Sequence, residues 1–377
     1  MKSRIYLSSP HMGGKEMEFV QEAFDSNWIA PVGLNINGFE QDLCRLTGSR
    51  YALALSSGTA AIHLALIVLG VQKDDIVLCQ SFTFAASANP IVYLGALPVF
   101  IDSEPVTWNM CPDALEAAIK HYLFSGKKPK AVVIVHLYGM PAFLKEIILI
   151  CARYDIALIE DAAEALGSSY FMQQLGTFGN LGILSFNGNK IITTSGGGAL
   201  LCQRQDYLAK AKFLASQAKD DAPHYEHSEV GYNYRLSNVL AGIGRGQMKV
   251  LPDRIQKRRL NFDFYKRHLA QLPGITFQEE PFGFFSNRWL TAIILDKEIS
   301  GVCKETIITD LENENIESRP VWKPMHLQPL FRHAPYFGGK VAESLFMKGL
   351  CLPSGSNLSE SELLRVTDHI KSVFPEA

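Results

Sequence analysis

Short apolar runs alternate with longer amphipathic segments along the chain, from about residue 15 to residue 250. Apolar positions recur at helical spacing in the segments 15–26 and 58–70, which predicts amphipathic helices there. The apolar runs are rich in β-branched residues and predict strands at ALALS, DIVLC, LPVFI, AVVIVHL and IALIE. Because these runs are apolar throughout, we expect a mainly parallel sheet covered by helices on both faces, which is an α/β fold.

The pattern changes after about residue 250. A helix dotted with Lys and Arg leads into the strand-like run WLTAIIL, an amphipathic stretch and a final helix near 359–373. We therefore predict a large α/β domain over 1–250 and a smaller α+β domain over 251–377. The segment 218–232 is the clearest polar loop.

Composition and charge narrow the class of protein. The 377 residues are 47% hydrophobic and 20% charged, with a formal net charge of −2, so neither a disordered chain nor a nucleic-acid partner is expected. Seven cysteines are scattered singly, which is typical of reduced thiols in the cytoplasm, and no metal site is predicted. No run is long enough for a signal peptide or a membrane span, so we expect no membrane partner.

Two polar segments follow predicted strands. Ser56-Ser57-Gly58-Thr59 opens a predicted helix, where free backbone N–H groups and the helix dipole could bind a phosphate. An ordinary helix cap explains these residues equally well. Asp161 ends an apolar strand, at the edge of a parallel sheet where ligands bind, although a capping role is also open for this acid or its neighbour Glu160.

Lys190 lies between the segment SFNGN and the run IITTSGGGALL. Small residues on both sides of a lysine, with three consecutive glycines after it, indicate close backbone approach to another group. A lone lysine is otherwise most often a solvated surface residue, so the neighbouring segments decide its interpretation.

Taken together, these segments resemble the DegT/DnrJ/EryC1/StrS family of pyridoxal-phosphate-dependent sugar aminotransferases. The resemblance extends over essentially the whole chain and is carried by ordered motifs: SSPHMGGKEMEFVQEAFDSNWIAPVG, SSGTAAIHLAL, SFTFAASANPI, VIVHLYGMPA, IEDAAEALGS, SFNGNK, GGGALL, GYNYRLSNVLAGIG and SRPVWKPMHLQP. It implies a fold-type-I aminotransferase, with a large domain built on a mainly parallel, seven-stranded type of sheet.

The resemblance also implies the roles of two catalytic residues. Lys190 would bind the aldehyde of pyridoxal 5'-phosphate as a Schiff base and shuttle a proton between substrate and cofactor. Asp161 would pair with the ring nitrogen and favour its protonated form. The other cofactor contacts implied are Ser57, Gly58, Thr59 and Ser185 at the phosphate, Phe84 and Glu164 at the ring, and Asn233 from the neighbouring subunit. A homodimer with shared active sites is therefore expected.

The substrate contacts that the resemblance implies come from four of the motifs. They are Trp28, Ile29, Pro31, His136, Arg235, Arg319, Trp322, Lys323 and His326. Simple packing is an alternative for Trp28 and Trp322, and a structural role for His326. The segments WKPMHLQP and DAAEALGS are most similar to enzymes that aminate UDP-linked 4-keto-6-deoxy-N-acetylhexosamines for surface glycans, with L-glutamate as the usual donor.

Other substrates and other classes of protein stay open. GDP-4-keto-6-deoxymannose and a dTDP-keto-sugar are alternative acceptors. Some relatives are sugar dehydratases in which histidine replaces the Schiff-base lysine, and a homologue could also keep the fold without catalysis. Lys190 argues against the dehydratase, and Lys190 together with Asp161 and Ser185 argues against a non-catalytic homologue.

Overall fold

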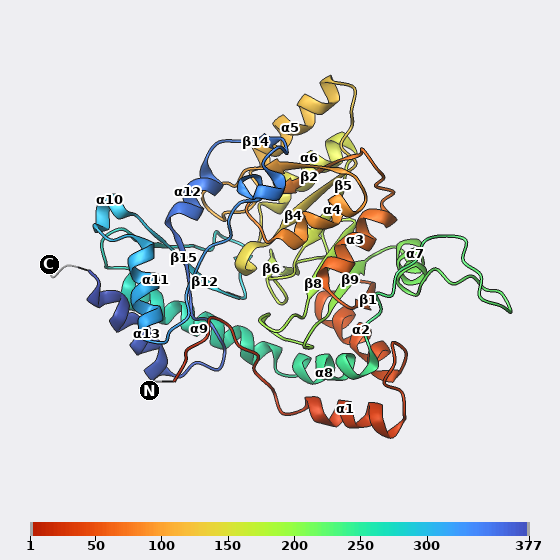
Figure 1. Ribbon diagram of the computed structural model, residues 1–377, viewed down its shortest axis with the longest axis horizontal. Helices are drawn as coiled ribbons and strands as arrows, with labels where there is room; N and C mark the ends of the chain where they lie inside the picture. Colours follow the sequence, from red (N-terminus) through yellow and green to blue (C-terminus); the bar gives the residue numbers. More distant parts are fainter. Residues whose placement is uncertain (1–2, 375–377) are drawn as a thin grey trace.

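A large mixed sheet forms the centre of the molecule in the computed structural model, which describes residues 3–374 (Figure 1). The strand order is β1-β9-β8-β5-β4-β2-β3-β14, and β9 is antiparallel to both of its neighbours while the remaining pairs are parallel. The strands are β1 (Tyr51–Leu55), β2 (Ile76–Gln80), β3 (Leu97–Ile101), β4 (Ala131–Val135), β5 (Ala157–Asp161), β8 (Leu181–Ser185), β9 (Gly198–Cys202) and β14 (Tyr336–Phe337).

Helices cover both faces of this sheet. Successive strand residues alternate between two hydrophobic cores: one core includes Ala54, Leu78 and Val132, and the other includes Leu55, Val77 and Val133. The first core packs against α2 (Leu34–Thr47), α5 (Pro112–Phe124) and α6 (Leu144–Tyr154), and the second against α3 (Gly58–Val68), α4 (Asn89–Tyr93) and α7 (Gln205–Ala215). Burial on both faces explains why the strands read as continuous apolar runs.

Three helices connect this layer structure to the rest of the chain. They are α1 (Glu16–Asp25), α8 (Asn238–Met248) and α9 (Leu251–Leu269), which lie along the lower edge in Figure 1. The side chain of Ser237 caps α8 by accepting from the backbone N–H of Leu240 at 3.3 Å. Short 3-10 turns are Ala85–Ser87, Leu137–Gly139, Met325–Leu327 and Pro329–Phe331.

A second sheet is built by the C-terminal part, in the order β10-β12-β15-β13. Its strands are β10 (Ile275–Phe277), β12 (Thr291–Leu295), β15 (Gly349–Leu352) and β13 (Arg319–Pro320), with α10 (Lys297–Ser300), α11 (Lys304–Asn313), α12 (Val341–Lys348) and α13 (Glu360–Ser372) around them. A small third sheet joins β11 (Phe284–Phe285), β6 (Ser169–Tyr170) and β7 (Gln173–Gln174). The C-terminal sheet has its own core, to which Ile5 of the N-terminal segment also belongs.

The α/β architecture and the strands that the sequence predicts are confirmed. The large sheet differs from the seven-stranded expectation because β14, from the C-terminal part, adds an eighth strand beside β3. Three strand pairings therefore cross residue 250, namely β14 with β3, β11 with β6, and the bridge between Ile5 and Ile316. The division into domains at 250 and 251 stays a proposal with these three crossings.

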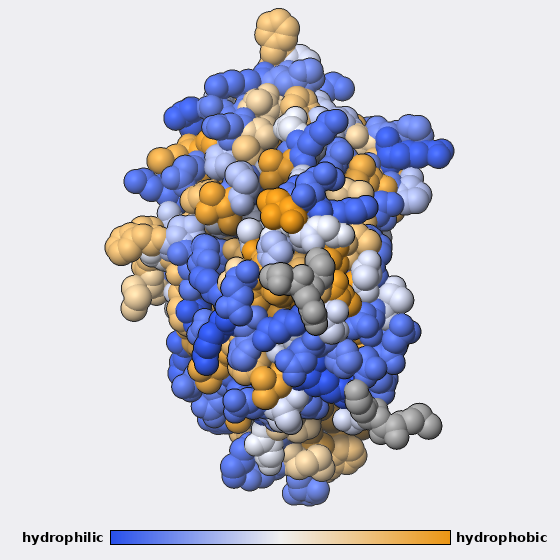
Figure 2. Space-filling model, turned by 90° about the vertical axis from the view of Figure 1, so that its left-hand side faces the viewer, coloured by the Kyte–Doolittle hydropathy of each residue, from blue (hydrophilic) through white to orange (hydrophobic). Residues whose placement is uncertain are grey.

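The end of the molecule formed by the C-terminal part carries mostly hydrophilic side chains, with hydrophobic ones in small separate groups (Figure 2). None of the helices within residues 3–374 is both long enough and apolar enough to traverse a bilayer.

Candidate active site

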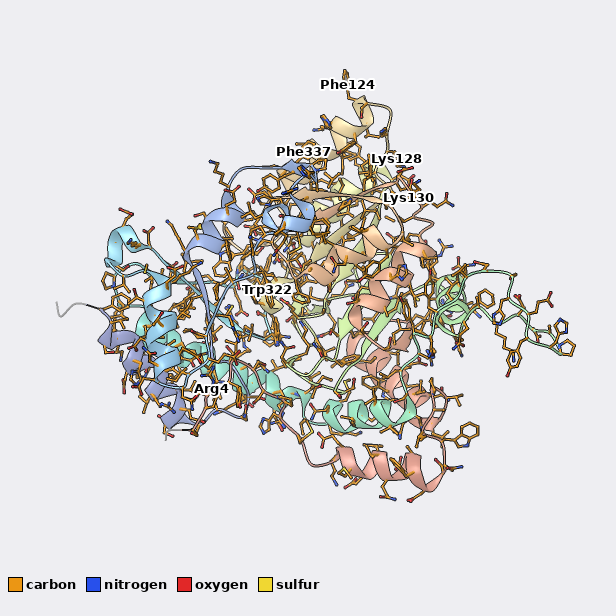
Figure 3. The ribbon with its side chains drawn as sticks, in the orientation of Figure 1. Arg4, Phe124, Lys128, Lys130, Trp322 and Phe337 are labelled. Carbon is orange, nitrogen blue, oxygen red and sulfur yellow. The ribbon has the colours of Figure 1, made fainter. Side chains whose placement is uncertain are left out.

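A cavity of about 350 Å³ opens at the edge of the large sheet where β1, β2, β5 and β8 end and β9 begins. Ligands of open α/β sheets bind at this carboxyl edge. Nine of the predicted residues line the cavity, namely Ser57, Gly58, Thr59, Phe84, Asp161, Glu164, Ser185, Lys190 and Trp322. Figure 3 shows Trp322 near the centre of the molecule, between the large sheet and the C-terminal part.

The N-terminus of α3 forms one wall of the cavity. Ser57 caps the helix, and its hydroxyl accepts from the backbone N–H of Ala60 at 3.0 Å. Gly58 packs closely on the end of β8, since a Cβ at this position would lie 3.3 Å from the Cβ of Ser185. The first N–H groups of a helix have no partner within it, so this wall offers backbone donors beside the Ser185 hydroxyl. Such a wall suits a phosphate.

Asp161 ends β5 and is 4% exposed. Its Oδ2 accepts from the hydroxyl of Ser87 at 2.6 Å, and its Oδ1 accepts from the backbone N–H of Ala163 at 3.1 Å. Burial raises the pKa of the carboxyl, and these two hydrogen bonds oppose that effect. A buried carboxylate that faces a cavity is well placed to pair with a cationic group of a ligand.

Lys190 follows β8 and its side chain is 14% exposed. Its Nζ lies 3.6 Å from Oε1 of Glu164 and 3.9 Å from the centre of the Trp289 ring. Burial raises the pKa of Glu164, and the charge of Lys190 and the N–H of Tyr138, which donates to Oε2 at 2.7 Å, act in the opposite direction. The amine is thus held between a carboxylate and an aromatic face.

Two aromatic side chains form the outer wall. The rings of Phe84 and Trp322 are 5.2 Å apart between centroids, and Phe84 is 53% exposed. The backbone N–H of Trp322 donates to the hydroxyl of the buried Tyr138 at 2.9 Å. A flat ring could stack on Phe84 at this opening.

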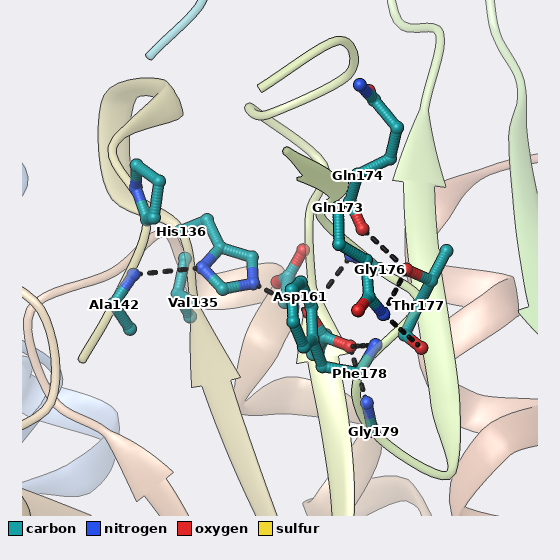
Figure 4. Close-up of polar contacts among 12 residues, drawn as sticks. Val135, His136, Ala142, Asp161, Gln173, Gln174, Gly176, Thr177, Phe178 and Gly179 are labelled. Carbon is teal, nitrogen blue, oxygen red and sulfur yellow. Dashed lines mark hydrogen bonds and ion pairs between the residues drawn. The ribbon is translucent and has the colours of Figure 1, made fainter. Parts of the chain in front are cut away.

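His136 does not reach the cavity. It is fully buried, its Nε2 lies 3.0 Å from Oε2 of Glu160, and its Nδ1 accepts from the backbone N–H of Ala142 at 3.2 Å (Figure 4). Glu160 also accepts from three backbone N–H groups, those of Gly176, Phe178 and Gly179. Both ring nitrogens have partners inside the core, and the contact of His136 with the substrate stays a prediction.

Three of the four predicted residues in the C-terminal motif also lie outside the cavity. Arg319 pairs with Glu317 at 3.1 Å, and Lys323 is exposed. His326 lies between the Ser81 hydroxyl, 2.6 Å from Nδ1, and Glu343, 3.4 Å from Nε2. Burial lowers the pKa of His326. Of this motif, only Trp322 forms part of the cavity wall.

The remaining predicted residues do not line the cavity of their own chain. Arg235 pairs with Glu40 at 2.9 Å. Trp28 and Ile29 are 56% and 50% exposed, Pro31 is exposed, and Asn233 is exposed on a strand-like segment that bridges to Ser216. Exposure of these side chains leaves them free to contact another molecule.

Several residues of the cavity are absent from the sequence-based set. They are Ile62, Thr83, Ala86, Ser87, Val135, Ala163, Asn187, Asn189, Gly196, Gly197 and Trp289. Ser87 and Thr83 belong to the motif SFTFAAS, so that motif was a usable signal for them. Trp289 comes from a distant part of the chain and had no spacing that linked it to Lys190.

A larger hollow of about 810 Å³ lies near the opposite edge of the sheet. It is lined in part by Lys128, Lys130 and Arg204, and Figure 3 shows the two lysines well away from Trp322. None of the predicted site residues lines it. Within the described residues, no group of three or more His, Cys, Asp or Glu side chains could hold a metal ion.

Comparisons with known proteins identify the family to which the chain belongs. The profile of the DegT/DnrJ/EryC1/StrS aminotransferase family matches residues 10–371. The chain is 53% identical, over 99% of its length and 97% of the relative, to EpsN of Bacillus subtilis (strain 168), whose name gives pyridoxal phosphate-dependent aminotransferase as a provisional class. It is 36% identical, over 98% of both chains, to the GDP-perosamine synthase of Caulobacter vibrioides.

A solved structure extends the comparison to the whole fold. The crystal structure of DesI in the presence of its TDP-sugar product aligns with a TM-score of 0.91 and 26% identity. The alignment covers 99% of this chain and 93% of that one.

Proposed function

Because this chain belongs to the DegT/DnrJ/EryC1/StrS family of pyridoxal-phosphate-dependent sugar aminotransferases, we propose that it aminates the 4-keto group of a nucleotide-linked 4-keto-6-deoxy sugar. The amino donor is an amino acid, L-glutamate. The observation that supports this most strongly is the convergence of Lys190, Asp161 and the N-terminus of α3 on one cavity.

The cavity fits the cofactor in three respects. The N-terminus of α3 and the Ser185 hydroxyl would hold the phosphate, the buried carboxylate of Asp161 would hold the protonated ring nitrogen, and Phe84 would pack on the ring. When bound, pyridoxal 5'-phosphate supplies an aldehyde that accepts an amino group and a ring that takes up electrons from the substrate carbon.

Lys190 supplies the amine and the proton transfer. Its Nζ would bind the aldehyde carbon at rest and, once released, would carry a proton between the substrate carbon and the former aldehyde carbon of the cofactor. Glu164, 3.6 Å from Nζ, stabilises the protonated amine between these transfers. The aromatic walls of Phe84, Trp289 and Trp322 limit access of water to this proton.

Lys190 also separates this reaction from the alternative classes. A non-catalytic homologue would leave the cofactor unaminated after exposure to L-glutamate alone, whereas the presence of Lys190 is the argument against a dehydratase. We expect L-glutamate to convert the absorbance of the lysine-bound cofactor to that of the aminated cofactor, and Lys190→Ala to abolish both signals. An unchanged spectrum with the wild-type protein would overturn the transaminase proposal.

For the acceptor, we propose a UDP-linked 2-acetamido-2,6-dideoxy-hexos-4-ulose used for surface glycans. The support is the likeness of the segments WKPMHLQP and DAAEALGS to enzymes of that specificity. A GDP-linked sugar is the second candidate, favoured by the 36% identity to a GDP-perosamine synthase, and DesI represents the dTDP alternative.

A thermal-shift series with UDP, GDP and dTDP separates these candidates. A ligand that binds only the folded protein raises the unfolding temperature, and a nucleotide at 100 times its Kd adds about 2.7 kcal/mol. We expect UDP to give the largest shift. A larger shift with GDP, followed by turnover of the GDP-linked keto-sugar, would transfer the assignment to GDP.

We also propose a cytoplasmic homodimer in which Asn233 reaches the active site of the partner subunit. Two facts support the dimer: Asn233 is exposed and does not line the cavity of its own chain, and the segment of Trp28 and Ile29 leaves large apolar side chains uncovered. All seven cysteines are free, which fits a reducing compartment.

A further inference from the structure

The backbone carbonyl of Asn189, directly before Lys190, is held by two side chains from distant parts of the sequence. The indole N–H of Trp289 donates to it at 2.8 Å, and the hydroxyl of Ser8 donates at 2.7 Å. Both hydrogen bonds are accepted by the carbonyl of the peptide bond between Asn189 and Lys190. They therefore fix the position of the Lys190 backbone, from which its side chain extends.

Trp289 also contacts the amine at the end of the Lys190 side chain. Its ring centre is 3.9 Å from Nζ, and the ring is 1% exposed and part of the cavity wall. The ring of Tyr138 also lies near the indole, with centroids 6.3 Å apart and an inclination of 24°. One side chain therefore contacts both the backbone before Lys190 and its amine.

A buried arginine holds this arrangement in place. The guanidinium of Arg258, 1% exposed, donates to the carbonyl of Trp289, to the carbonyl of Ser354 at 3.2 Å and to the hydroxyl of Ser8 at 2.9 Å. Burial lowers its pKa to about 9, and no carboxylate within residues 3–374 pairs with it. Burial of a charge without a counter-ion is costly, so carbonyl and hydroxyl acceptors at this point are a specific requirement.

We propose that Trp289 is a positioning residue for Lys190, and that Ser8 and Arg258 hold it in register. The N–H of its indole fixes the Asn189 peptide, and its ring face supports the amine while the lysine is detached from the cofactor. This inference rests on the role proposed above for Lys190. It also gives the C-terminal part a task in catalysis, since Trp289 and Arg258 both lie beyond residue 250.

Ordinary core packing would require only that Trp289 fill space. Two substitutions separate packing from positioning: Trp289→Phe keeps an aromatic face and loses the N–H, and Trp289→Leu loses both. Trp108→Phe is the matched control, because Trp108 is also buried, at 4% exposure, and does not line the cavity.

The measurement is the rate at which pyridoxal 5'-phosphate becomes attached to Lys190 of the apoprotein, trapped by borohydride and located by mass spectrometry. We expect Trp289→Leu to slow attachment by about tenfold or more, since displacement of a reacting group by about 1 Å costs up to 10²-fold. Trp289→Phe should fall between this variant and wild type, and Trp108→Phe should stay within about twofold. In steady state, kcat should fall for Trp289→Leu while KM for the amino donor is unchanged.

Attachment and kcat at wild-type levels in Trp289→Leu would overturn the proposal. If that variant fails to fold, Ser8→Ala removes one of the two bonds to the Asn189 carbonyl and should slow attachment by about threefold, and an unchanged rate would be equally decisive. Lys190→Ala separates this inference from its premise: cofactor trapped elsewhere in that variant would overturn the role of Lys190 itself.

Discussion

The hydroxyl of Ser87 donates to Asp161 at the base of the cavity, 2.6 Å from Oδ2. Burial raises the pKa of Asp161 and this bond lowers it, because the bond favours the ionised carboxylate. Ser87→Ala should therefore raise the pKa of Asp161 further. The protonated carboxyl cannot hold a cationic ring nitrogen, so activity on the acid side should be lost at a higher pH than in wild type.

The prediction is measured as kcat over a range of about pH 5 to 9. At alkaline pH, where the carboxyl is ionised in both proteins, Ser87→Ala should retain kcat within about threefold. Ser125→Ala is a suitable control, since its exposed hydroxyl only donates to the carbonyl of Tyr122. Superimposable acid limbs for Ser87→Ala and wild type would contradict the role of this bond.

A second prediction at the scale of single residues concerns His136. Its buried contact with Glu160 stabilises the core, so His136→Gln should lower the free energy of unfolding by about 2 to 4 kcal/mol. The side chain does not line the cavity, so KM for the sugar nucleotide should stay within about twofold. Denaturant unfolding and steady-state kinetics test the two parts, and a large rise in KM at unchanged stability would support a contact of His136 with the substrate instead.

At the scale of elements, the strands and long helices could be predicted because their signals are local. The predicted helix over 58–70 corresponds to α3 (Gly58–Val68), and LPVFI corresponds to β3. The strand β14 could not be predicted, because its two residues have no periodicity. It is held by long-range contacts: the carboxylate of Asp102 accepts from the N–H groups of Gly339, Val341 and Ala342 next to it.

The junction of α3, β8 and β9 is the element-scale feature on which phosphate binding depends. A Cβ at Gly198 would lie 2.4 Å from the backbone nitrogen of Gly58 and 2.4 Å from the carbonyl carbon of Ser57. Gly198→Ala should therefore push the N-terminus of α3 away from β9. Overpacking of this kind costs about 1 to 3 kcal/mol, so cofactor affinity should fall by about tenfold or more.

Equilibrium titration of the apoprotein with pyridoxal 5'-phosphate checks this effect. Gly188→Ala is the matched control, since the nearest atom to its added Cβ would be 3.9 Å away. Equal affinities for Gly198→Ala and wild type would show that the N-terminus of α3 does not hold the phosphate.

For the whole molecule, the limits of prediction follow from where each contact originates. Lys190, Asp161 and Gly58 each lie at or after the end of a strand of the large sheet and line one cavity, and it was the resemblance of their motifs to one family that grouped them. Trp289 lines the same cavity, and Arg258 forms a hydrogen bond with the Trp289 carbonyl. Both residues come from the C-terminal part, so only tertiary packing brings them to the site. His136 shows a second reason why sequence patterns are insufficient. A polar residue that follows a strand can face the ligand site, or it can form a hydrogen bond with a buried neighbour, as His136 does with Glu160.

Assembly is the largest scale at which the site can be tested. If Lys190 of one subunit and Asn233 of the other form each active site, neither single variant, Lys190→Ala nor Asn233→Ala, has a complete site as a homodimer. A mixed dimer of the two has one site with both wild-type residues and one site with neither. Mixing equal amounts under exchange gives mixed dimers in about half of the population, so about a quarter of wild-type activity should return.

The recovery must depend on subunit exchange. Activity should therefore return only as fast as the dimers dissociate. Mixing Lys190→Ala with a second catalytic variant, Asp161→Asn, provides the control, since both residues line the cavity of the same chain. In that mixed dimer each site lacks one of the two groups, so no activity should return. Equal recovery in both mixtures, or none in either, would show that Asn233 does not act across the dimer.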